Sequence, residues 1–273
     1  MVRNFRRSDL RFGTSKRYAA RLSHQDNYTR NEGYTQFLAN WDANFYAKYS
    51  DALKPMCCGE RVLDIGCGVG QVVAYLANAG YEAHGVDVSE PSIARAQKSC
   101  ARCQVYDGRS LPYSDAYFAS AGALNVLEHV DEPEAFLDEV VRVVKPGGKI
   151  VISSPNFMRV FGLRDYHPHM RGLRSKWRNW RRLRQKRREM ALTPELLRFD
   201  RMTPIVARSF QPDDDAIIAT NSLEIAFLLE RAGCEIVHVA CTDRYVFKPL
   251  DLLLNATPLR YVLFNSFVVA RKK

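Results

Sequence analysis

Three glycines on alternate positions follow an apolar run near residue 65. The run Val62-Leu63-Asp64-Ile65 is typical of a buried strand, and Gly66-Cys67-Gly68-Val69-Gly70 comes directly after it. A strand that ends in a glycine-rich turn and leads into a helix lets the backbone approach a ligand that any Cβ would keep away. The pattern therefore indicates a site for a small-molecule cofactor. Its spacing is not that of a dinucleotide-binding turn, because Gln71 stands where the last glycine would be.

Acidic residues end the next two predicted strands. The segment 83–86 leads into Asp87 and Val88, and the segment 103–106 leads into Asp107 and Gly108. The carboxyl ends of neighbouring parallel strands meet at one edge of a sheet, so we expect both carboxylates beside the glycine turn. Asp87 can accept both hydroxyls of a ribose, and Asp107 can accept from an adenine amino group.

This series of a glycine turn, Asp87 and Asp107 resembles the class I S-adenosylmethionine (SAM)-dependent methyltransferases motif for motif. The segments 124–130 and 144–152 look like the fourth- and fifth-strand motifs of that family, so the resemblance covers residues 56 to 155. It is strongest to the group that contains ubiquinone-pathway and small-molecule methyltransferases. It implies SAM as the cofactor and an α/β Rossmann-like fold with a seven-stranded, mostly parallel sheet whose last strand is antiparallel.

The resemblance also implies which residues bind SAM. The glycine turn is expected to approach the amino-acid and ribose portions of the cofactor, because SAM has no phosphate. Asp64 is expected to support the turn or to meet the ammonium group, and Asn125 and Val126 are expected to face the sulfonium. The full predicted set is Asp64, Gly66, Cys67, Gly68, Gly70, Asp87, Val88, Asp107, Gly108, Asn125 and Val126.

The acceptor side is less determined by the sequence. A hydroxyl acceptor needs a general base, and His129 after the fourth strand is a candidate, although Glu-His-Val occurs throughout the resembled group irrespective of substrate. His167 is a second candidate, as a base or as a metal pair with His169, the alternative being a surface turn. Some ubiquinone-pathway O-methyltransferases carry Glu-x-x-Glu-His at the fourth strand, a possible set of divalent-metal ligands. Asn125 replaces the first Glu here, so we assign no metal ligand.

Three more residues of the segment after the fifth strand are candidates for touching the acceptor. They are Asn156, Arg164 and Tyr166.

The net charge of +10 arises in one segment. Residues 171–188 hold ten Lys and Arg and no acid, which leaves 30 basic residues to balance the 30 acidic ones elsewhere. Helical spacing places Leu173, Trp177, Trp180 and Leu183 on one stripe. Such a helix can lie in an anionic membrane interface, can bind RNA phosphates and stack bases, or can pack its stripe on the domain as an ordinary surface helix. In the resembled family this segment covers the acceptor, which favours a lipophilic acceptor and a membrane over RNA.

The chain divides into an N-terminal helical cap at 1–55 and a methyltransferase domain at 56–273, with a basic helical insertion at 156–207. Aromatic positions of the cap include Tyr28, Tyr34, Trp41, Phe45, Tyr46 and Tyr49. After the insertion we expect a helix over 222–232 that Gly233 ends, and strands over 235–240 and 267–270.

No secretory signal or membrane-spanning run is evident, and the seven cysteines suggest no disulfide framework. The expected location is cytoplasmic, with peripheral attachment to a membrane as the further expectation. The expected function is transfer of a methyl group from SAM to an oxygen, or alternatively a nitrogen, of a small-molecule or lipid-linked acceptor. The alternatives are an RNA methyltransferase that uses residues 171–188, and a SAM-binding regulator without turnover.

Overall fold

The structure is a computed structural model that describes residues 29, 32–39, 43–162, 165, 167–205 and 213–273. Within these residues one sheet has the strand order β3-β2-β1-β4-β5-β7-β6. The strands are β1 Arg61–Ile65, β2 Glu82–Asp87, β3 Cys103–Val105, β4 Phe118–Leu124, β5 Val144–Pro155, β6 Cys234–Ala240 and β7 Asn265–Lys272. Strands β1 to β5 pair in parallel, whereas β7 is antiparallel to both β5 and β6. The predicted fold class is confirmed.

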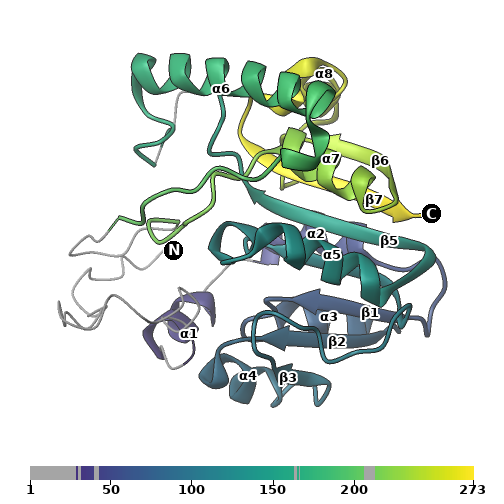
Figure 1. The fold of residues 1–273 in the computed structure, drawn as a ribbon. Helices are drawn as coiled ribbons and strands as arrows, with labels where there is room; N and C mark the ends of the chain where they lie inside the picture. The colour runs from purple at the N-terminus through teal and green to yellow at the C-terminus, as the bar shows by residue number, and fades with distance from the viewer. Residues whose placement is uncertain (1–28, 30–31, 40–42, 163–164, 166, 206–212) are drawn as a thin grey trace.

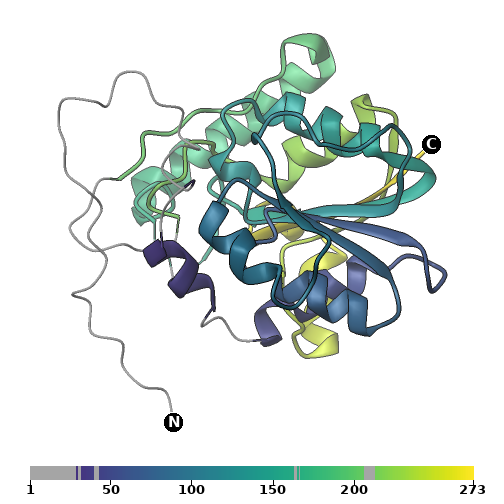
Figure 2. The same ribbon diagram turned by 90° about the horizontal axis from the view of Figure 1, so that it is seen from below.

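The helices cover both faces of this sheet (Figures 1 and 2). They are α1 Glu32–Ala39, α2 Ala43–Leu53, α3 Gln71–Asn78, α4 Glu90–Ala96, α5 Pro133–Val143, α6 Gly172–Leu192, α7 Ser222–Arg231 and α8 Lys248–Asn255, with 3-10 turns η2 Leu127–His129, η3 Pro194–Leu196 and η4 Pro258–Tyr261. Apolar residues of α2, α3 and α4 share one core cluster, and those of α5 and α7 share another. The sheet therefore lies between two helical layers.

The central strand β4 consists mainly of small residues, and this lets α2 approach the sheet closely. A Cβ at Gly122 would lie 2.8 Å from the hydroxyl of Tyr49 and 2.7 Å from the carbonyl oxygen of Val151. Tyr49 and Leu53 of α2 are fully buried against this surface. Helix α2 thus packs on the sheet through Tyr49 and Leu53, and the division of the chain at residue 55 stays a prediction.

The end of the chain follows the predicted pattern. The side chain of Asn221 accepts a hydrogen bond from the amide of Glu224 and so caps the start of α7. Gly233, with φ +90°, follows its last turn. Strands β6 and β7 then form as expected, but α8 between them was not predicted. None of the described helices is long and apolar enough to cross a membrane.

Candidate functional site

Hydrogen bonds join the glycine turn to Asp87 at the carboxyl end of the sheet. The backbone amide of Gly68 donates to Oδ2 of Asp87 at 2.8 Å, and the amide of Ser89 donates to Oδ1 at 2.8 Å. The amide of Gly66 donates to the carbonyl of Val86 at 2.8 Å. Each carboxylate oxygen has two lone-pair positions, so Asp87 can hold the turn and still accept from a ligand. Burial raises the pKa of Asp87, and the two amides oppose that rise.

Two glycines of the turn are required by backbone conformation and by neighbouring side chains. Gly66 and Gly70 have φ of +73° and +80°, the left-handed region in which a Cβ is unfavourable. A Cβ at Gly66 would also collide with Val126, and one at Gly70 would lie 2.8 Å from Cβ of Ala96 in α4. The sequence analysis expected these missing side chains to make room for the cofactor. In the structure they make room for the protein's own side chains.

Helix α1 lies over Gly68, the middle glycine of the turn. A Cβ at Gly68 would lie 2.8 Å from Cδ1 of Leu38. The hydroxyls of Thr35 and Ser92 hydrogen-bond at 2.9 Å and join α1 to α4. This places α1 of the predicted N-terminal cap beside the turn, while Tyr28 and Trp41 lie outside the described residues.

Asp64 is buried beneath the turn and contacts α2. Its Oδ1 accepts a hydrogen bond from the hydroxyl of Tyr49 at 2.8 Å. Burial raises the pKa of Asp64 to about 7, although the bond from Tyr49 opposes the rise. The hydrogen bond from Tyr49 already fixes the orientation of this carboxyl for an ammonium group. Contact between Asp64 and the amino-acid portion of SAM stays a prediction.

The other residues that were predicted to bind the cofactor differ in how far they are exposed to solvent. The thiol of Cys67 is buried in the core cluster of α2, α3 and α4, so any contact with a cofactor would come from its backbone. Asp107 is exposed and accepts from the backbone amides of residues 109–110 at 2.8 and 2.9 Å, which fixes its orientation. Gly108 is buried at φ +76°, and Val88 is half-buried.

The end of β4 brings Asn125 and Val126 to the glycine turn. Asn125 has φ +53°, a conformation that Asn tolerates better than most residues, and its amide donates to the carbonyl of Ser153 at 2.8 Å. The side chain of Val126 packs on Gly66. Both residues therefore lie at the predicted edge of the sheet.

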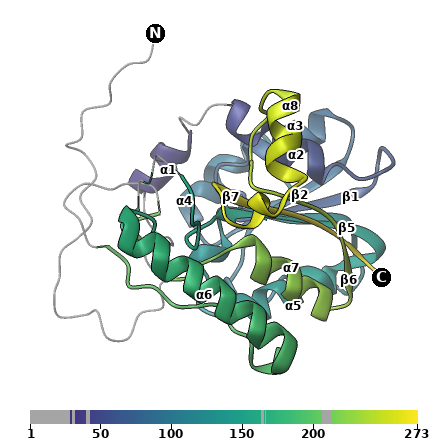
Figure 3. The same cartoon turned by 90° about the horizontal axis from the view of Figure 1, so that it is seen from above.

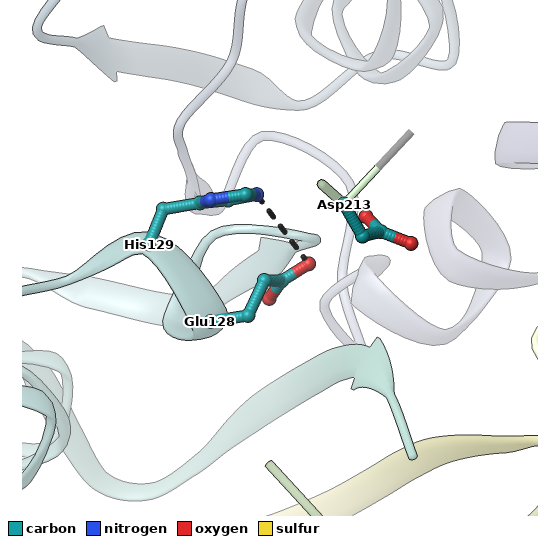
Figure 4. A group of neighbouring side chains, drawn as sticks. All are labelled: Glu128, His129 and Asp213. Carbon is teal, nitrogen blue, oxygen red and sulfur yellow. Dashed lines mark ion pairs between the residues drawn. The ribbon is translucent and has the colours of Figure 1, made fainter. Parts of the chain in front are cut away.

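The turn η2 presents a buried carboxylate and an imidazole side by side. Glu128 is fully buried, and its Oε2 accepts from the hydroxyl of Ser154 at 2.9 Å. Nε2 of His129 lies 3.9 Å from Oε1 of Glu128, and Nδ1 lies 3.8 Å from Oδ1 of Asp215. Glu128, His129 and Asp213 each place one donor atom within 4.8 Å of the others (Figure 4).

The segment that carries these aspartates is held against η2 by the backbone. The amides of Ile217 and Ile218 donate to the carbonyl of Glu128 at 2.9 and 3.1 Å. Although burial lowers the pKa of His129, the carboxylates of Asp215 and Glu128 raise it above its ordinary value. Asp213 and Asp215 were not predicted, because residues so far along the chain from His129 give no sequence signal of contact with it.

His167 lies in the core under α6. It is 1% exposed, and its ring meets Phe157 edge-on with centroids 5.0 Å apart. Burial, and then the neighbouring His169, lower its pKa to about 4. The expected surface turn is therefore wrong for this side chain, and its predicted role as a base is not supported by its packing.

Asn156 also has a packing role. Its amide nitrogen donates to the carbonyls of Tyr261 and Leu263 at 3.1 and 2.9 Å, which ties the end of β5 to η4. Arg164 and Tyr166 lie outside the described residues.

The outer face of α6 is basic and aromatic. Leu173 and Trp177 are 89% and 59% exposed, and the rings of Trp177 and Trp180 stack with centroids 4.9 Å apart. The guanidinium of Arg184 lies 4.8 Å from the ring centroid of Trp180. The exposed arginines around them are Arg174, Arg178, Arg181, Arg184, Arg187 and Arg188. The alternative in which this stripe packs on the domain holds only for Leu183, which is the one residue of the four that is buried.

The inner face of α6 is polar and buried. Asn179 donates to the carbonyls of Phe157 and Arg159, and Lys186 is 1% exposed. Nζ of Lys186 lies 2.6 Å from Oε1 of Glu224 and 3.0 Å from Oδ1 of Asp200. These contacts join α6 to α7, and Figure 3 shows the two helices side by side.

Comparison with known proteins agrees with this architecture. Residues 63–152 match the family model described as a methyltransferase domain. The ubiquinone biosynthesis O-methyltransferase of Idiomarina loihiensis is 33% identical over 109 residues, which are 36% of this chain and 43% of that protein. Norajmaline N-methyltransferase of Rauvolfia serpentina is 35% identical over 105 residues, 35% of this chain and 36% of that protein. The chain thus spans less than half the length of each of these relatives.

Solved structures show the same fold at low sequence identity. A SAM-dependent methyltransferase from Mesorhizobium loti superposes with a TM-score of 0.53 at 18% identity, over 84% of this chain and 98% of that one. One from Aquifex aeolicus gives 0.50 at 16% identity, over 88% and 97%. The motifs, the fold and the family match agree, and the chain therefore carries a class I SAM-dependent methyltransferase domain, an enzyme domain whose cofactor is SAM.

Proposed function

We propose that this protein transfers the methyl group of SAM to an oxygen, or alternatively a nitrogen, of a small-molecule or lipid-linked acceptor at an anionic membrane surface. The observation that carries the proposal is the edge of the sheet where Asp87 holds the glycine turn and Asn125 and Val126 meet it. Several relatives are named O-methyltransferases, which favours oxygen, and norajmaline N-methyltransferase keeps nitrogen as the alternative.

The protein's contribution to such a reaction is mainly positioning. Bound SAM supplies a methyl group made electrophilic by its sulfonium. Asp87 and Asp107 would hold the ribose and the adenine, and Val126 would close the side of the turn next to the acceptor. A hydroxyl acceptor also has to lose a proton, and His129 at the end of β4 is the candidate base. Holding the acceptor in line with the methyl group supplies much of the rate.

Labelled SAM and a cell extract test the reaction. After incubation with the methyl-labelled cofactor, the label is partitioned into lipid, RNA and aqueous fractions. Label in the lipid or aqueous small-molecule fraction supports the proposal, and label in RNA supports an RNA methyltransferase instead. Binding of SAM with no transfer to any fraction would indicate a regulator. An Asp87→Ala variant is the control, because it should lose both the cofactor and the label.

The membrane part of the proposal rests on the outer face of α6. Exposed Trp and Leu beside arginines fit a membrane interface, where the rings lie at the headgroup level and each arginine contributes about 1 kcal/mol near an anionic surface. The rings of Trp177 and Trp180 stack on each other, and the guanidinium of Arg184 lies over the ring of Trp180, so these ring contacts are all within α6. Replacing both with Ala should therefore leave the fold unchanged.

Sedimentation with lipid vesicles tests this part separately. The wild-type chain should bind vesicles of phosphatidylcholine with phosphatidylglycerol and bind phosphatidylcholine alone much less. Trp177→Ala with Trp180→Ala should reduce the bound fraction severalfold. A control variant, Arg271→Gln with Lys273→Gln, removes two charges in and next to β7, outside α6, and should not reduce it. Unchanged sedimentation of the Trp variant refutes the membrane role, and competition by RNA in place of vesicles would support the nucleic-acid alternative.

A further inference from the structure

The carboxyl of Glu128 has one oxygen whose surroundings are incomplete. Its Oε2 accepts from Ser154, but Oε1 is buried and has no hydrogen-bond partner within the described structure. A buried carboxylate oxygen without a partner costs free energy, so such an atom calls for an explanation. Nε2 of His129 is 3.9 Å from this oxygen, which is too far for a hydrogen bond.

A third donor reaches the same point from a distant part of the chain. Donor atoms of Glu128, His129 and Asp213 all lie within 4.8 Å of one another, and Figure 4 shows the three side chains as neighbours. Ligands that share one cation lie at most about 4.4 Å apart when each metal–ligand bond is about 2.2 Å long, so these donors need to move together only slightly to bind one ion. Asp213 holds φ +66°, a left-handed conformation that turns it toward η2.

We infer that Glu128, His129 and Asp213 form a binding site for a divalent cation of the Mn²⁺ or Zn²⁺ type. One imidazole and two carboxylates suit these cations better than Mg²⁺ or Ca²⁺, which prefer oxygen ligands alone. The donor set differs from the Glu-x-x-Glu-His pattern of some ubiquinone-pathway enzymes. Asp213, brought in by the segment after the basic helix, supplies the third donor here.

Surrounding contacts hold these donors in place. Ser154 fixes Glu128, and Asp215 lies 3.8 Å from Nδ1 of His129, which leaves Nε2 on the side of Glu128. A carboxylate behind a metal-binding imidazole is the usual arrangement for orienting that ring. With three protein ligands, the cation keeps open positions for an oxygen of the acceptor. That role rests on the proposed function. With the cation bound, His129 is a metal ligand and not the general base, because an imidazole lone pair that binds a metal cannot also take a proton.

Titration of the metal-free full-length chain with Mn²⁺ tests the site. The signal of free Mn²⁺ in electron paramagnetic resonance should fall until one ion per chain is bound, and bound Mn²⁺ or Zn²⁺ should raise the melting temperature. Asp213→Asn should weaken binding at least tenfold and abolish the rise. Asp214→Asn makes the same charge change one residue along and should bind like the wild type.

The control on folding is the melting temperature of both variants without metal, which should match that of the wild type. Failure of the wild-type chain to bind either ion below millimolar concentration would overturn the inference, and so would equal binding by Asp213→Asn. Neither SAM nor an acceptor is present in this titration, so its failure leaves the proposed methyl transfer untouched. If the labelled methyl group is transferred at the same rate with and without added metal, only the role of the cation in binding the acceptor is refuted.

Discussion

Replacing Lys186 with Met should destabilise the protein strongly at high pH and weakly at low pH. In the wild type, Nζ of Lys186 lies 2.6 Å from Glu224 and 3.0 Å from Asp200, and Lys186 also donates to the carbonyl of Arg198. Met keeps the length of the chain and the helix propensity of α6 but removes the charge. Asp200 keeps Arg182, whose guanidinium donates to both of its oxygens at 2.6 Å. Glu224, fully buried, loses its cation.

The expected loss in the free energy of unfolding depends on the charge of Glu224. Removing one partner of a buried ion pair typically costs about 3–5 kcal/mol. Burial raises the pKa of Glu224 to about 7, with Lys186 opposing the rise, so without Lys186 the pKa rises further. The folded pKa then lies above the ordinary 4.5, which means that protonation favours folding and that this contribution is lost as the pH rises through 7 and beyond. Below the folded pKa, Glu224 is neutral, and the loss falls to about 1–2 kcal/mol for the missing hydrogen bond.

Urea unfolding of the two proteins at about pH 5.5 and pH 8.5 measures this difference. The double variant Lys186→Met with Glu224→Gln should recover most of the loss at high pH, because no buried charge then remains. An equal loss at both pH values, or no recovery in the double variant, would refute the assignment of the cost to the buried carboxylate.

Three further variants test the cofactor edge. Gly66→Ala should lower the free energy of unfolding by about 1–3 kcal/mol, because residue 66 has a positive φ and a Cβ there collides with Val126. Adding Val126→Ala to the same chain should recover only the part of the loss that is due to the collision. Thermal unfolding measures both effects. Asp87→Asn should reduce SAM affinity at least tenfold in calorimetry, since Asn keeps an acceptor for the turn but offers one oxygen fewer for a ribose. Tyr49→Phe removes the hydrogen bond that opposes the rise in the pKa of Asp64, so the loss of stability as the pH rises through about 7 should move to higher pH in urea unfolding.

The cofactor edge was predictable because its signals are local. An apolar run followed by glycines, and an acid at each of the next two strand ends, need only neighbouring residues to be recognised. The resemblance then supplied the strand order and the antiparallel β7, which the residues alone do not fix. The sequence did not show why glycine is needed at residues 66 and 70. The side chains that a Cβ would meet there, Val126 and Ala96, come from other elements of the fold.

The third donor of the inferred cation site was not predictable, because it joins residues far apart in the chain. Asp213 reaches Glu128 and His129 only through the path of the chain after α6. Helix α8 has a weak sequence signal for another reason. It is only eight residues long, with Pro249 in its first turn, and its leucine-rich pattern is too short to show a clear helical period.

The basic helix shows why a charge count alone cannot assign a partner. Its ten cations were taken together, yet Lys186 belongs to the inner face, where its charge is neutralised by acids from α7 and the segment after η3. The outer face keeps its exposed arginines and both tryptophans. Because structural contacts and exposed groups lie on opposite sides, a change at Lys186 should alter stability and a change at Trp177 should alter binding. Separate responses of this kind would show that α6 anchors the domain with one face and meets its partner with the other.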